Sequence, residues 1–267
     1  MTSKINSNIS YFSSHNLIGY KEGISRPDEY LIFMAHWDHL GVNEELVGDQ
    51  IFNGAADNAA GVAAVIELAR KFDQIQTERS IIFTALTLEE SGLLGSAYLA
   101  ENPPFDLANV VAGFNFDRVL PTGKTKDMAV IGYGASELED YLEAELEKQG
   151  RYINPDPNPE KGYFYRSDHI SFAKKGVPVL YSDDGFDLEE GGIEEGFKEI
   201  YDYTNFRYHG VNDEYDPSWN LEGFEQTIDT IFNISQDLSN SSDWPNWYEG
   251  NEFRATRDAQ LSSKNNP

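Results

Sequence analysis

Short apolar runs alternate along this chain with segments whose apolar residues recur at helical spacing. The runs have the length and composition of buried strands, and they lie at 29–36, 79–87, 109–117, 127–132 and 177–182. The helical segments lie at 59–75, 136–150 and 220–239. This alternation is typical of a layered α/β domain. No repeat and no Gly-, Ser- or Pro-rich linker divides it.

The same pattern sets the predicted domain limits. We expect one domain over residues 1–240, in which the first ~15 residues are flexible. Residues 241–267 then form an aromatic and polar tail.

Polar side chains stand at the carboxyl ends of three predicted strands. His36 ends the first run, Glu89 and Glu90 follow the second, and Asp117 ends the third. Ligands of open α/β sheets bind at the carboxyl ends of the strands. These four residues are therefore expected to converge on one edge of the sheet.

The segment HWDHLG, residues 36–41, is similar to part of the metallo-β-lactamase signature. Met34 stands where the leading histidine of that signature would be. That site also has no use for glutamates, so the acidic residues favour another assignment.

A second assignment uses those acidic residues as ligands of two metal ions. Asp57 lies in the Gly- and Ala-rich stretch NGAADNAAG, residues 53–61, where small neighbours allow a close approach. Its carboxylate has two oxygens and can bridge two cations. One site then comprises His36, Asp57 and Asp117, and the other comprises Asp57, Glu90 and His209.

The ligand types also indicate which metal would bind. The chain has no cysteine, so thiolate ligands are excluded. Imidazole and carboxylate ligands suit zinc, with manganese or cobalt as substitutes. We therefore expect two zinc ions.

Six stretches, in this order, resemble peptidase family M28, the co-catalytic zinc aminopeptidases: AHWDHLG, NGAADNAAG, TLEESGLLGS, NFD, YRSDHISFAKKGVPVLY and YHGVNDEYD. The likeness runs from about residue 16 to about residue 250. It implies a single-domain, three-layer sandwich of the zinc-peptidase (phosphorylase/hydrolase-like) type, with a mixed, mostly parallel eight-stranded sheet between helices. It also implies that Asp57 bridges the two ions. A secreted or periplasmic location follows from the resemblance, although MTSKINSNIS at the N-terminus lacks the apolar core of a signal peptide.

The expected chemistry assigns a role to each residue near the metals. Water held between two ions about 3.5–4 Å apart loses its proton near neutral pH. Glu89, free of metal, would accept that proton and pass it to the leaving amine. Asp38 would hold the second imidazole N–H of His36, and His39 would pack or hydrogen-bond nearby.

The resemblance implies two further catalytic side chains. Tyr208 and Arg166 correspond to the tyrosine and arginine that help to stabilise the oxyanion in similar aminopeptidases. Asp168 and His169, beside Arg166, are interpreted as support for the substrate loop.

Three further features lie near the proposed metal ligands in the sequence. Arg118 follows Asp117 where similar enzymes commonly carry an apolar Met, which changes the pocket wall. Asp213, four residues past His209, is a candidate partner for that imidazole. The acidic segment 182–199 is interpreted as a solvated loop, with the alternative that it borders the pocket and discourages acidic peptides.

Charge narrows the range of partners. The chain carries 46 Asp+Glu against 20 Lys+Arg, a formal net charge of −26, which disfavours nucleic acid and anionic membranes. No apolar run approaches the roughly 20 residues that span a bilayer. An acidic rim would favour positively charged substrates.

The favoured function is an aminopeptidase acting on peptides with a free N-terminus, without an obligate protein partner. Glu89 and Asp117 are candidates to recognise the α-amine. A carboxypeptidase or dipeptidase on the same fold needs a cationic pocket, for which Arg166 is a candidate. A glutaminyl cyclase shares the fold but uses one zinc, and a non-catalytic scaffold usually loses ligands or the base. The sequence does not determine the preferred N-terminal residue or the oligomeric state.

Overall fold

A seven-stranded sheet forms the centre of the protein in a computed structural model that describes residues 3–7 and 9–265. Its strand order is β1-β5-β2-β6-β9-β7-β8. The strands are β1 (Leu17–Lys21), β2 (Arg26–His36), β5 (Arg79–Leu86), β6 (Val110–Asn115), β7 (Asp127–Val130), β8 (Tyr152–Pro155) and β9 (Val179–Asp184). β1 and β7 run antiparallel to β5 and β9, and the other neighbours are parallel. The predicted mixed, mostly parallel sheet is confirmed.

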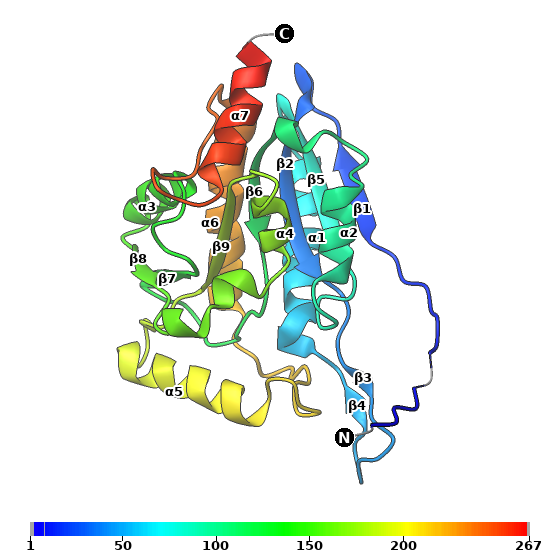
Figure 1. The fold of residues 1–267 in the computed structure, drawn as a ribbon. Helices are drawn as coiled ribbons and strands as arrows, with labels where there is room; N and C mark the ends of the chain where they lie inside the picture. The colour runs from blue at the N-terminus through cyan, green and yellow to red at the C-terminus, as the bar shows by residue number, and fades with distance from the viewer. Residues whose placement is uncertain (1–2, 8, 266–267) are drawn as a thin grey trace.

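The expected strand count of eight is wrong for this sheet. The two remaining strands, β3 (Gly41–Val42) and β4 (Ile51–Phe52), pair with each other as a separate hairpin. They are two residues long and largely exposed, and Figure 1 shows them beyond the end of the main sheet.

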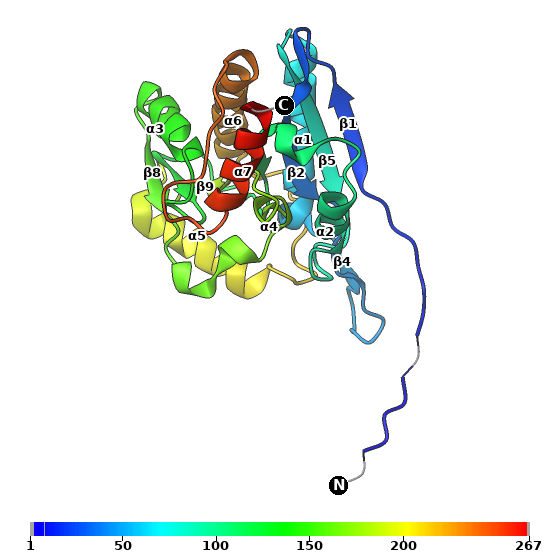
Figure 2. The same cartoon turned by 45° about the horizontal axis from the view of Figure 1, so that its top comes forward.

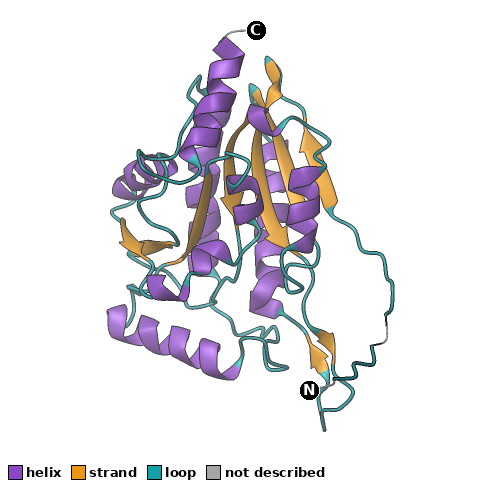
Figure 3. Ribbon diagram, in the orientation of Figure 1, coloured by secondary structure: helices purple, strands orange, loops and turns teal. Residues whose placement is uncertain are grey.

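Helices cover both faces of the sheet, which confirms the three-layer sandwich (Figures 1 and 3). One face carries α1 (Ala60–Asp73), α3 (Leu138–Lys148) and α6 (Glu222–Asn240). The other carries α2 (Leu94–Glu101), α4 (His169–Ala173) and α7 (Arg254–Asn265), as the tilted view in Figure 2 shows. Within the described residues, no helix combines the length and apolar character that crossing a bilayer requires.

The central strand β2 is buried on both sides. Leu31 and Phe33 pack into the core below α1 and α6, whereas Ile32 and Met34 pack into the core below α2 and α4. All four side chains have 0% exposure. A strand that buries both faces has a continuous apolar run rather than an alternating one, which is the pattern that the sequence shows here.

Helix α5 (Gly192–Phe206) lies across the end of the sheet at which β2 finishes (Figure 1). The prediction of a loop over 182–199 is therefore wrong, because this segment contains the end of β9 and the first half of α5. Glu194 and Glu195 occupy the first turn of α5, where negative charge stabilises a helix N-terminus. Phe197 stacks on Phe186 at 4.8 Å between ring centroids and packs this helix against the preceding loop.

The chain after residue 240 packs back onto the sheet layer. Trp247 is fully buried beside Phe253 and donates from Nε1 to the carbonyl of Gly176. Arg257, on α7, donates to the carbonyl oxygens of Val110 and Val111. The division of the chain at residue 240 stays a prediction.

Candidate metal centre

Three adjacent strands bring the predicted ligands to one edge. β2 lies between β5 and β6, and His36 is paired with Leu86 at the carboxyl ends of β2 and β5. Glu89 and Glu90 follow β5, and Asp117 follows β6. Because all three strands run parallel and finish level, their trailing residues meet above the same edge.

Asp57 reaches the same edge from a single turn, Ala55–Ala59, that precedes α1. The carboxylate of Asp213 accepts hydrogen bonds from the backbone N–H groups of Ala56 (2.9 Å) and Asp57 (3.0 Å). Asp213 thus anchors this turn, whereas the sequence suggested it as a partner of His209.

The five proposed ligands form two groups that share Asp57. Oδ1 of Asp57 lies 3.1 Å from Nε2 of His36, and the same nitrogen lies 3.2 Å from Oδ1 of Asp117. Oδ2 of Asp57 lies 3.4 Å from Nε2 of His209, which lies 3.1 Å from Oε2 of Glu90. Each oxygen of Asp57 therefore faces a different group, which is the arrangement that a bridging carboxylate requires.

Opposite charges perturb the ionisation of this cluster. Burial by itself would lower the pKa of His36, but Asp117 and Asp57 raise that pKa well above its ordinary value. Hydrogen bonds to Asp57 and Glu90 raise the pKa of His209 to about 10. Without a metal ion, the carboxylates hold protons on both imidazoles. A divalent cation would displace these protons, because an imidazole binds metal in its neutral form, and the cation would then balance the negative charge of the carboxylates.

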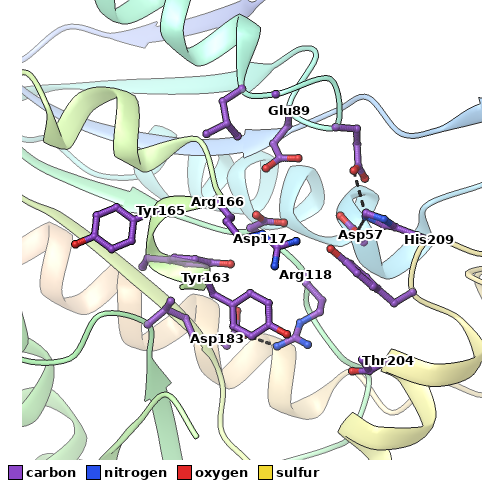
Figure 4. A pocket seen from close by; sticks show the side chains of 16 residues that line it. Asp57, Glu89, Asp117, Arg118, Tyr163, Tyr165, Arg166, Asp183, Thr204 and His209 are labelled. Carbon is purple, nitrogen blue, oxygen red and sulfur yellow. Dashed lines mark hydrogen bonds and ion pairs between the residues drawn. The ribbon is translucent and has the colours of Figure 1, made fainter. Parts of the chain in front are cut away.

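Glu89 differs from the proposed metal ligands in its hydrogen bonding. Its side chain lines the cavity (Figure 4) and accepts no hydrogen bond from the described part of the chain. Burial, followed by the negative charge of Asp117, raises the pKa of Glu89 to about 9. Nearby cations act in the opposite direction, so metal binding would bring this carboxyl into the range of a general base.

Asp38 contacts His36 through its backbone. The main-chain oxygen of Asp38 lies 3.1 Å from Nδ1 of His36, while its carboxylate oxygen Oδ1 lies 3.8 Å away. That carboxylate instead accepts from the backbone N–H groups of Glu89 and Glu90. Asp38 therefore links the ends of β2 and β5, and the atom next to the imidazole differs from the one expected.

His39 lies against the second group of ligands. Its Nδ1 is 2.9 Å from Oε1 of Glu90, yet neither atom makes a hydrogen bond of acceptable geometry within the described residues. The ring also meets that of His209 edge to face, with centroids 5.8 Å apart. The sequence anticipated packing or hydrogen bonding here, and the structure shows packing.

These observations test whether the residues fit zinc. The donors are imidazole nitrogens and carboxylate oxygens with no thiolate, as zinc, manganese and cobalt sites use. Three sets of residues offer ligand atoms that lie within 4.8 Å of one another: His36, Asp57 and Asp117; His36, Glu89 and Glu90; and His39, Asp57 and Glu90. Oε1 of Glu90 is buried without a hydrogen bond, which a bound cation would satisfy. The residues fit the metal.

A cavity of about 450 Å³ opens beside this centre (Figure 4). Tyr208 and Arg166 both line it. The Tyr208 ring stacks on His209 with centroids 3.9 Å apart, and its hydroxyl has no hydrogen-bond partner in the described chain. Arg166 is exposed and lies over the ring of Tyr163 at 5.5 Å.

The cavity lining also contains Arg118, which the sequence marked as a changed position, and two residues that the sequence did not identify. Arg118 lines it and donates to Asp183, which lies at the end of β9. Tyr181 and Thr204 line it as well. The sequence indicated a changed pocket wall because Arg118 replaces the apolar residue of similar enzymes. Only the fold shows that the carboxylate paired with Arg118 comes from β9.

The pair beside Arg166 is buried. His169 has 0% exposure and lies between the rings of Phe164 and Tyr181, each 4.8 Å from it. Asp168 has 1% exposure, and burial raises its pKa to about 7. Both positions are consistent with support of the cavity wall, and neither side chain lines the cavity.

Comparison with known proteins places this arrangement among zinc peptidases. The profile of peptidase family M28 matches residues 16–235. A probable zinc metalloprotease of Pyrenophora tritici-repentis is 29% identical over 209 residues, covering 74% of this chain and 46% of that protein. Aminopeptidase YwaD of Bacillus subtilis is 31% identical over 110 residues, covering 40% of this chain and 22% of that protein.

A solved structure shows the same fold. An aminopeptidase from Aneurinibacillus sp. strain AM-1 is similar with a TM-score of 0.62 and 22% identity, covering 86% of this chain and 49% of that chain. The matched regions span less than half the length of each of these three relatives.

Proposed function

The chain belongs to peptidase family M28, and from this premise we propose that it is a two-zinc aminopeptidase that removes N-terminal residues from peptides. The observation that carries the proposal is the position of Asp57. Its two oxygens face His36 at 3.1 Å and His209 at 3.4 Å. Glu89 lines the same cavity and makes no side-chain hydrogen bond within the described residues, which leaves its carboxyl available to carry a proton.

The proposed ligands divide as the geometry suggests. His36, Asp57 and Asp117 would hold one zinc ion, and Asp57, Glu90 and His209 would hold the other. When bound, two such ions lower the pKa of water and polarise the scissile carbonyl.

The protein's own groups move the protons and hold the substrate. Glu89 accepts a proton from the attacking water and returns it to the leaving amine. The Tyr208 hydroxyl, which has no hydrogen-bond partner among the described residues, donates a hydrogen bond to the developing oxyanion, and Arg166 adds a positive charge nearby. The carboxylates of Glu89 and Asp117 lie within the same cavity and are the proposed partners of the free α-amine.

The first experiment combines metal analysis with kinetics on aminoacyl-nitroanilides and their N-acetylated forms. We expect about two zinc ions per chain and cleavage of the free-amine substrates only. Glu89→Gln should lower kcat by about 10²–10⁴-fold without loss of zinc. Glu249→Gln, an exposed position outside the cavity, is the matched control and should behave like the parent protein.

Different results would redirect the assignment. Equal cleavage of acetylated and free-amine substrates would contradict an aminopeptidase. Turnover confined to dipeptides or to substrates with a free C-terminus would favour the dipeptidase or carboxypeptidase alternative, which Arg118 and Arg166 in the cavity support. A protein that binds no metal would favour the scaffold alternative.

Two wider proposals rest on the family resemblance. The partners are peptides with a free N-terminus, and the location is outside the cytoplasm, by secretion or in a periplasm.

A further inference from the structure

The cavity lining includes an arginine whose positive charge is only partly neutralised. Arg118 directly follows Asp117, and both line the cavity. In Figure 4 the Arg118 side chain extends from beside Asp117 toward Asp183, to which it donates from Nη2. A guanidinium has five N–H donors. Asp183 is the only side-chain partner of this one among the described residues.

The surroundings of Arg118 do not favour an apolar ligand. Its side chain is 25% exposed and that of Asp183 is 9% exposed, so the ion pair sits at the cavity surface rather than beneath it. An apolar group placed against this pair would remove water from the unused N–H groups without replacing their hydrogen bonds, which is unfavourable. The aliphatic residues along this cavity are Leu93 and Ile131.

Outside the proposed metal ligands and Glu89, the charged residues that line the cavity are positive on balance. Arg118 and Arg166 contribute two positive charges, and Asp183 contributes one negative charge. Arg166 makes no ion pair within the described chain and contacts the ring of Tyr163 instead. Planar guanidinium groups with free donors bind carboxylates through paired hydrogen bonds.

We propose that Arg118, oriented by Asp183, forms a subsite for a carboxylate of the substrate. This inference rests on the proposed peptidase function, because it places the substrate in the cavity beside the metal ligands. The carboxylate has two chemical sources: the acidic side chain of an N-terminal Asp or Glu, or the terminal carboxylate of a dipeptide.

The test compares matched substrates that differ only in this charge. Glu- and Gln-nitroanilide report a side-chain carboxylate, while Ala-Gly and Ala-Gly-amide report a terminal one. In the zinc-loaded protein, kcat/KM should favour the carboxylate member of one pair by at least about tenfold. Arg118→Gln should reduce that preference by about ten- to a hundredfold.

Two further variants separate recognition from folding. Arg118→Gln/Asp183→Asn removes both charges, so that no carboxylate is left unpaired in the wall, and it should lose the preference as the single variant does. Arg70→Gln makes the same change of charge on α1, where Arg70 pairs with Glu67 outside the cavity. It should keep the preference of the parent protein.

The outcomes distinguish the subsite from the proposed function. Equal kcat/KM for the two members of both pairs, or a carboxylate preference that Arg118→Gln leaves unchanged, would overturn the subsite while leaving the aminopeptidase intact. If no substrate of either kind is cleaved, the proposed function fails, and calorimetry with L-glutamate and L-glutamine then decides. Binding of glutamate alone, or equal binding of both amino acids through the terminal carboxylate, would support the subsite if Arg118→Gln removes it. Binding that this variant leaves unchanged, or no binding, would overturn the subsite.

Discussion

At the scale of single residues, Asp57 has the largest predicted effect on metal content. It is 3% exposed, and its two oxygens face two separate imidazoles. An asparagine of the same shape has one oxygen, so it can serve at most one ion. Asp57→Asn should therefore retain less than one zinc ion per chain after dialysis, measured by elemental analysis against about two for the parent protein.

The comparison variants for this prediction each touch one group of ligands. Asp117→Asn and Glu90→Gln should keep about one zinc ion each, because the other group stays complete. Two tightly held ions in Asp57→Asn would show that this carboxylate does not bridge.

His169 gives a prediction for acid stability. Burial between two aromatic rings lowers the pKa of this imidazole to about 3, whereas an imidazole in the unfolded chain titrates near about 6.5. Between these values the unfolded chain binds the extra proton, so this contribution to stability is complete above pH ~6.5 and is lost as the pH falls.

Replacing that imidazole should flatten the acid response. From pH 7 to pH 5, His169→Phe should lose about 2 kcal/mol less free energy of unfolding than the parent protein. Urea titrations of both proteins in chelator would measure the difference. His15→Gln, at an exposed imidazole, is the control, and a response of His169→Phe equal to that of the control would refute the assignment.

At the scale of elements, the metal centre depends on how one turn is anchored. The turn Ala55–Ala59 is held by Asp213, which is 0% exposed and accepts from Ala56, Asp57 and the hydroxyl of Tyr203. Asp213→Asn replaces one accepting oxygen with a donor that faces other donors. We expect a loss of about 1–3 kcal/mol in the metal-free protein, measured by urea unfolding.

A neighbouring aspartate supplies the control for this prediction. Asp216 is exposed, and among the described residues its carboxylate accepts hydrogen bonds only from Ser218, so Asp216→Asn should change stability far less than Asp213→Asn. Equal effects of the two variants would mean that the turn is held by the rest of the chain.

The elements also show which parts of the site are predictable from sequence. His36, Glu90 and Asp117 follow apolar runs, and parallel strands bring such ends together whatever their separation in the chain. Asp213 was assigned to His209 because they are close in sequence, yet the turn residues that it holds lie more than 150 positions away. Pairing across the fold leaves no local signal.

Two of the helices missed by the sequence pattern, α5 and α7, carry many charged or polar residues. The acidic residues of α5 led to its interpretation as a solvated loop, although a charged helix can also be solvated on one face. Their stability comes from contacts with distant segments, as Arg257 shows through its hydrogen bonds to the backbone of β6. The identity of the Arg118 partner was hidden for the same reason.

At the scale of the whole molecule, the net charge of −26 opposes the local positive charge of Arg118 and Arg166 in the cavity. The two act over different distances. The field of the whole protein is screened within about 8 Å at 0.15 M ionic strength and within about 30 Å at 0.01 M. A hydrogen-bonded carboxylate at Arg118 is in contact and is screened far less.

This difference predicts opposite effects of salt on capture and on recognition. For peptides with lysines after the cleaved bond, kcat/KM should fall about tenfold from 0.01 to 0.15 M ionic strength, because attraction to the acidic surface weakens. For peptides with glutamates at these positions, kcat/KM should rise over the same range, and for neutral peptides it should change little.

The preference set by Arg118 should persist at both salt concentrations, because contact hydrogen bonds determine it. Kinetics of the three peptide sets at constant pH would measure both effects, and a salt response independent of peptide charge would show that the acidic surface does not reach the cavity.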